Sequence, residues 1–278
     1  MGYTPASGQL LREAIAPETR IRLWNVLHLS YWGASSSREL AYSDLNALVL
    51  RIWHHFFAWR IDEQPEYLDR AVAAIDSQFI QFKWHKLFDF MEFVANNGPE
   101  DRAGRFRQLV NTVLSEDNSA YRFVGSEMAE ITSSTEIASI EDALATASSN
   151  RLTGVTTHLS TALHLLSDKT TPDYRNSIKE SVSAVEGIAQ LFVGDTKATL
   201  GAALSVLEKR GHLHGALKSS LSSLYGYTSD ADGIRHAMLE EPTLTFTDAK
   251  FMLVACSAFV NFMIAKAADL GVSLNQPT

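Results

Sequence analysis

The adjacent pair Arg235-His236 offers the clearest acid–base chemistry in this sequence. The pair follows two aspartates, Asp230 and Asp232, in the segment GYTSDADGIRHAM. Histidine exchanges a proton near neutral pH, and arginine stabilises the charge that develops on a phosphate under attack. The pair therefore suits the cleavage of RNA without a metal, with the ribose 2′-hydroxyl as nucleophile. A buried ion network between these aspartates and Arg235, which would fix the loop, is the competing interpretation.

A second polar set lies on the expected helix DYRNSIKESVSAVE. Arg175 and Lys179 occupy a side distinct from its apolar stripe, and we expect them to hold an RNA backbone. Asn176 or Glu180 would orient the histidine, provided that this helix and the Arg-His segment converge. With Asp232, these four residues form the predicted substrate-binding set. The alternative is an ordinary solvated helix face with a mixed charge.

No metal and no cofactor are expected. His54 and His55 are adjacent, so their side chains point about 100° apart on a helix and are unable to share one ion. His212 and His214 lack a carboxylate or cysteine at supporting spacing. The sequence contains no HExxH, CxxC, GxGxxG, P-loop or GxSxG motif, which excludes most well-marked enzyme classes.

Composition indicates a globular protein of the cytoplasm. Hydrophobic residues make up 46% of the 278 residues and charged residues 20%, which is a balance able to form a buried core. The single cysteine, Cys256, is predicted to be a small core residue. No secretory signal is visible, and the stretch FMLVACSAFVNFMIAK is too short for a bilayer, so no membrane partner is expected. The net charge of -8 argues against avid non-specific binding to nucleic acid.

The elements that must position these residues are predicted to be helices in two domains. All five tryptophans lie in the first third of the chain, whereas the second half is rich in Ala, Ser and Leu. This shift predicts domains over 1–145 and 150–278, and the low Pro and Gly content favours an all-α fold. Apolar periodicity in the first domain predicts helices over 20–31, 43–59, from Pro65 to 75, 83–94 and 102–114, then a small hairpin over 121–132 and a helix capped by Ser133 or Ser134.

The second domain is predicted to be a bundle of four or five helices. Thr171-Pro172 reads as the start of one helix and Gly194 as its end. The final helix is apolar on most faces, which predicts that it forms the centre of the bundle. The predicted helices cover 153–166, 173–193, 200–207, 213–225 and 248–268, with a loop over 226–233.

The segments that carry these patterns resemble a known family. The second domain, through DYRNSIKESVSAVE, TLGAALSVLEKRGHLHGALKSSLSSLYGYTSDADGIRHAM and FMLVACSAFVNFMI, resembles the C-terminal HEPN domain of AbiJ-type abortive-infection proteins. The first domain, through RIRLWNVL, KWHKLFDFMEFV and YRFVGSEMAEIT, resembles the class 4 N-terminal domain of the same proteins. The resemblance implies phage defence or a toxin-like stress response. It also implies a homodimer through the C-terminal domain, with RNA as the expected partner.

The resemblance bears on the catalytic motif as well. Many HEPN domains are metal-independent ribonucleases that carry an Arg, four to six further residues and a His. If His236 is that histidine, the arginine should occupy position 229, 230 or 231. The sequence has Ser229, Asp230 and Ala231 there, and none of these is basic. A non-catalytic module that binds RNA, a nucleotide or a partner protein is therefore the alternative.

One other span in the second domain has the family's spacing. Arg151 and His158 are separated by six residues. They lie in a different helix from the motif in this alignment, so we interpret the spacing as coincidence.

Overall fold

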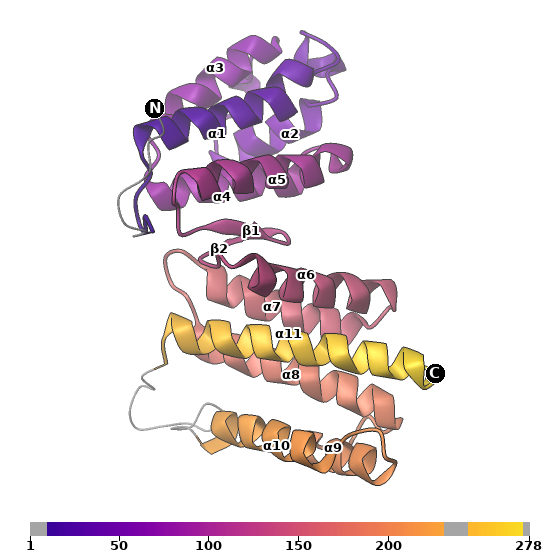
Figure 1. The fold of residues 1–278 in the computed structure, drawn as a ribbon. Coiled ribbons are helices and arrows are strands. Elements are labelled where there is room, and N and C mark those ends of the chain that lie inside the picture. The colour runs from indigo at the N-terminus through magenta and orange to yellow at the C-terminus, as the bar shows by residue number, and fades with distance from the viewer. Residues whose placement is uncertain (1–9, 231–243, 275–278) are drawn as a thin grey trace, which may run out of the picture. The chain divides into compact units, whose positions relative to one another are not determined.

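A computed structural model describes residues 10–230 and 244–274 of the chain. Within these ranges, eleven α-helices and one two-stranded antiparallel hairpin form the main elements (Figure 1). The predicted all-α fold with one small hairpin is confirmed. Contacts divide the chain into a first unit, 1–132, and a second unit, 133–278. This division precedes the sequence-predicted boundary at 145–150, because helix α6 (Ser134–Ser149) packs within the second unit.

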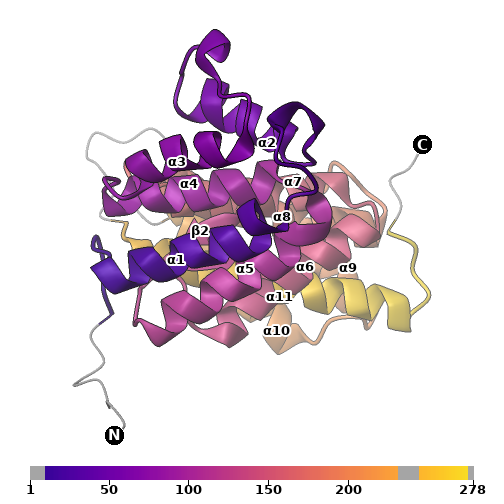
Figure 2. The ribbon, with the colours of Figure 1, turned by 90° about the horizontal axis from the view of Figure 1, so that it is seen from above.

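The first unit is built on helices of uneven length. Helix α1 begins with Pro17 at its first position, as expected for a residue without an amide hydrogen. Near this start of α1, Arg22 bonds to Glu116 and Asp117 at the end of α5, so α1 and α5 run antiparallel and side by side (Figure 1, Figure 2). The helices are α1 (Pro17–Ser30), α2 (Asn46–Arg51), α3 (Leu68–Phe79), α4 (Trp84–Asn97) and α5 (Glu100–Glu116), with 3₁₀ turns at Trp32–Ala34, Leu40–Tyr42 and Ile61–Glu63.

The single helix predicted over 43–59 is wrong in its detail. Helix α2 ends at Arg51 and continues as a π-helical turn, Ile52–Phe56. The chain then leaves the helix at Ala58, whose φ of 54° lies in the left-handed region. Apolar spacing does not reveal a single π-turn, because such a turn shifts the apolar stripe by only about one position. Directly after the π-turn, the ring of Phe57 stacks on Trp59, with centroids 4.2 Å apart.

The predicted hairpin is confirmed. Strand β1 (Arg122–Val124) pairs antiparallel with β2 (Glu127–Ala129), and Phe123 lies opposite Met128. Gly125 opens the two-residue turn with φ 56°, a conformation that glycine adopts without strain. The hairpin packs on α4 and α5 and closes the core of the first unit.

The second unit is a more regular bundle. Helix α11 packs against α6, α7 and α8 (Figure 1). It does not form the centre alone as predicted, because Phe251 and Phe262 are exposed on it and α8 contacts α7, α9, α10 and α11. Ser133 caps α6, and Gly194 ends α8 in the left-handed conformation, both as predicted. Besides α6, the helices are α7 (Thr153–Ser167), α8 (Tyr174–Val193), α9 (Leu200–Lys209), α10 (Gly215–Asp230) and α11 (Phe246–Asp269).

Two predicted helix ends in the second unit need correction. The N-cap of α8 is Asp173 and not Thr171, because the Asp173 carboxylate accepts the backbone N–H of Asn176 at 2.9 Å. Pro172 therefore lies outside the helix. Helix α10 extends to Asp230, so the loop predicted over 226–233 begins later than expected.

Helix α11 also corrects the prediction that its apolar stretch is too short for a bilayer. It has 24 residues, and by length and composition alone it is able to cross a membrane. Half of its most apolar window is buried inside the protein, and core packing accounts for that composition. Cys256 lies in this buried part and is 2% exposed, which confirms its predicted place in the core. Burial raises the pKa of its thiol to about 12.

Candidate functional site

A hydrogen bond between helices α7 and α8 joins a histidine to one of the predicted site residues. His158 Nδ1 lies 2.6 Å from Glu180 Oε2. The two helices form an antiparallel hairpin, whose register is fixed one to two turns away by the Ser177 hydroxyl, which donates to the Ala162 carbonyl at 2.8 Å. Ser177 is completely buried, so this side-chain bond joins α8 to the backbone of α7 in the interior, close to the pair.

The geometry of the pair suits proton transfer. A carboxylate only accepts hydrogen bonds, so His158 Nδ1 is the donor and Nε2 is left to accept a proton. The two side chains are 39% and 23% exposed, which makes the imidazole reachable from solvent while Glu180 limits its rotation. A carboxylate that holds a histidine in one tautomer is the arrangement used in acid–base catalysis.

The predicted substrate-binding residues of α8 lie around this pair with different roles. Lys179 is exposed next to Glu180 and makes no ion pair within the described part of the chain. Arg175 lies one turn earlier and is partly buried. Asn176 is engaged by the helix cap, since its side-chain amide donates to Asp173 Oδ2 at 2.7 Å. The structure thus gives Glu180 a histidine partner, His158.

The other predicted residues are not reached by the structure. Arg235, His236 and Asp232 lie outside the described residues. Whether they converge with α8 stays a prediction.

Sequence reasoning missed the histidine that Glu180 holds. The spacing of Arg151 and His158 was interpreted as coincidence, and Arg151 is indeed an exposed turn residue with φ 58° between α6 and α7. A signal for His158 was nevertheless present. Two helices joined by a short connection centred near position 169 place residue 158 opposite residue 180, so the pairing follows from the hairpin itself.

The described residues offer no alternative centre for a metal. Over 10–230 and 244–274, no group of three or more His, Cys, Asp or Glu side chains gathers around a common point. His54 and His55 lie with their rings 4.7 Å apart on the π-turn, without a supporting carboxylate.

Comparison with known proteins assigns the first part of the chain. The family model for AbiJ N-terminal domain 4 matches residues 1–146. The chain belongs to this AbiJ family. The match confirms the resemblance seen in the first domain, and an AbiJ-family domain suggests phage defence by abortive infection. No curated protein and no solved structure matches the chain. The second unit of this AbiJ-family protein is unassigned beyond 146, so its HEPN resemblance stays a prediction.

Proposed function

We propose that this AbiJ-family protein acts in the cytoplasm as an abortive-infection effector whose HEPN-like second unit cleaves RNA without a metal. The observation that carries the proposal is the solvent-accessible His158–Glu180 pair, at 2.6 Å, with the exposed Lys179 next to Glu180 in the chain. The pair supplies a positioned base, and Lys179 and Arg175 supply contacts to phosphate. The family match over 1–146 supports the defence role.

The reaction needs only the groups named above. His158 Nε2 accepts the proton of a ribose 2′-hydroxyl, and the oxygen attacks the adjacent phosphorus. The new O2′–P bond forms as the P–O5′ bond breaks, which leaves a 2′,3′-cyclic phosphate and a 5′-hydroxyl. The leaving oxygen takes its proton from water or from a second acid, the role predicted for His236. Lys179 and Arg175 would stabilise the charge on the phosphate oxygens.

A phage challenge with matched variants tests the proposal. Cells that express the wild-type protein are expected to stop growing on infection and to show cleaved RNA with cyclic phosphate ends. His158→Gln and Glu180→Gln should abolish both effects, whereas His164→Gln, on an exposed position of the same helix, should keep them. Thermal melts of the purified variants check that each is folded.

The same experiment distinguishes the alternative. A protein that protects cells and binds RNA, yet leaves RNA intact, would be the non-catalytic module that the altered Arg-His spacing suggests. In that case Lys179→Gln should weaken RNA binding while His158→Gln leaves protection unchanged. Arg235→Ala/His236→Ala, tested beside these variants, shows whether the predicted pair contributes.

A homodimer through the second unit is part of the proposal. Phe251 and Phe262 are 57% and 38% exposed on one face of α11, with Ala255 and Ala258 between them. Large rings alternating with small residues allow a second copy of the same face to interdigitate. Light scattering should give twice the chain mass, and Phe251→Asp/Phe262→Asp should give a monomer. Ile21→Asp, an equally apolar exposed position in the first unit, is the control.

A further inference from the structure

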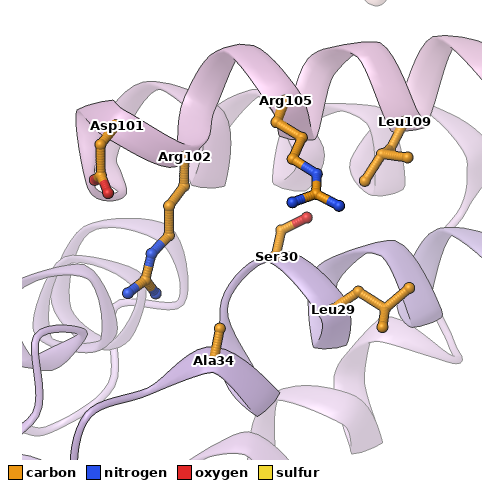
Figure 3. Close-up of a pocket in the computed structure, with 7 residues that line it drawn as sticks. All are labelled: Leu29, Ser30, Ala34, Asp101, Arg102, Arg105 and Leu109. Atoms are coloured by element: carbon orange, nitrogen blue, oxygen red, sulfur yellow. The ribbon is translucent and has the colours of Figure 1, made fainter.

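A groove in the first unit lies between the end of α1 and the start of α5 (Figure 3). Its volume is about 360 Å³. One end is apolar, with Leu29 and Leu109, and the centre and opposite end are polar, with Ser30, Arg102, Arg105 and Asp101. The antiparallel pairing of α1 and α5 places these residues together, although about 70 positions separate them in the sequence.

Three hydrogen-bond donors line the groove without an acceptor in the described part of the chain. Arg102 uses one guanidinium nitrogen to hold Asp44, and its buried Nη1 has no partner within the described chain. The buried hydroxyl of Ser30 likewise has no partner there. Arg105 makes no hydrogen bond or ion pair with any described residue, and Figure 3 shows its guanidinium directed toward Ser30. Buried polar groups left unsatisfied cost about 1–3 kcal/mol each, so an acceptor is expected here.

We propose that this groove binds a phosphate-bearing small molecule of nucleotide size. Guanidinium groups recognise oxyanions through paired N–H donors, and the hydroxyl adds a third direction. Several donors spread along the groove suit a phosphate, which offers more acceptor oxygens than a carboxylate. The volume falls within the range of small-molecule pockets, and Leu29 and Leu109 provide a wall for the uncharged part of the ligand.

Asp101 limits the phosphate affinity of this groove. Its carboxylate lies in the first turn of α5, where a negative charge stabilises the helix terminus. The same charge repels a phosphate at Arg102 and Arg105. Removal of the charge in Asp101→Asn should therefore strengthen phosphate binding while it slightly weakens the helix.

Titration calorimetry on the full chain, with AMP and inorganic phosphate as probes, tests the site. We expect AMP to bind more tightly than inorganic phosphate, Arg105→Gln to lose tenfold or more of the affinity for both, and Asp101→Asn to gain severalfold. Leu109→Ser should weaken AMP and leave phosphate unchanged. Lys209→Gln, which changes an exposed cation of the second unit outside both sites, should bind both probes like wild type.

The outcomes separate clearly. Wild-type affinity in Arg105→Gln, or no binding of AMP by wild type and Asp101→Asn at millimolar concentration, would overturn the site. Phosphate binding without a gain for AMP would overturn the nucleotide-sized ligand. Because the groove and the His158–Glu180 pair share no residues, loss of AMP binding in Arg105→Gln with RNA cleavage intact would still support the groove.

Discussion

The two units of this protein bury different kinds of side chain. The fully buried large residues of the first unit include six aromatic side chains, and their rings meet at mixed angles between helices of uneven length. The second unit buries alanines, leucines and valines, together with Ser177, Ser181 and Ser257 at 0% exposure. Small residues let regular helices approach closely, whereas large rings fill the gaps that irregular turns leave. The difference explains why the first unit accommodates a π-turn, whereas the second is a bundle of regular helices.

The largest expected effect breaks the aromatic core. Phe90→Ala removes a fully buried ring that contacts Phe56, Phe57 and Phe79, and it should lower the free energy of unfolding of the first unit by about 3–5 kcal/mol. Chemical denaturation followed by tryptophan fluorescence reports on this unit, because every tryptophan lies in it. A loss below about 1 kcal/mol would show that the core repacks easily.

The matching change in the second unit adds volume. Ala184 is completely buried on α8, and Ala184→Leu should destabilise the bundle by about 1–3 kcal/mol through overpacking. The loss of stability is measured by far-UV circular dichroism during denaturation, while tryptophan fluorescence should report an unchanged stability of the first unit. Ala→Leu at the exposed Ala145 of α6 is the control, and equal loss at both positions would contradict close packing at Ala184.

Alkaline pH should affect the second unit first. Burial keeps the Cys256 thiol protonated to about pH 12 in the folded protein, whereas its ordinary pKa is 9.0. The unfolded chain therefore loses this proton first, and stability falls as pH rises above 9, by about 1 kcal/mol between pH 9 and 10. Cys256→Ala should remove that slope.

In the first unit, burial raises the pKa of Tyr31 from 10.0 to about 12. The loss of stability with rising pH therefore begins one pH unit higher there, and it should vanish in Tyr31→Phe.

The smallest effects are expected where the units are alike. Each joins two helices by a partly exposed ion pair, Arg22 with Glu116 and Asp117 in the first and Lys250 with Glu136 in the second. Arg22→Ala and Lys250→Ala should each cost less than about 1 kcal/mol and lose that effect in high salt. A larger loss in one unit would show that its surface, and not only its core, sets its stability.

Much of the fold was predictable because periodicity reports burial directly. The apolar stripe through Leu87, Met91 and Val94 and the stop at Gly194 were enough to define α4 and the end of α8. The π-turn was not, since its apolar spacing matches an ordinary helix. The start of α8 was misplaced because Asp173 and the preceding Thr171-Pro172 carry competing cap signals.

The candidate sites were less predictable than the fold. Glu180 was predicted to orient His236, whereas the structure pairs it with His158, and this partner depends on the pairing of two helices. The groove around Ser30 and Arg105 depends on contacts between distant segments, and neither residue stands out in the sequence. Its unpaired donors exist only once the chain has folded.

The position of α6 has a consequence for how such proteins are divided or recombined. The AbiJ family match ends at 146, within α6, although Ile140, Ala143 and Ala147 of this helix are buried in the second unit. A fragment that stops at 146 would expose the apolar face of α6 that the second unit normally buries, and we expect it to aggregate. Exchange of effector modules between relatives should succeed when the junction falls between Thr132 and Ser133, so that α6 travels with the effector.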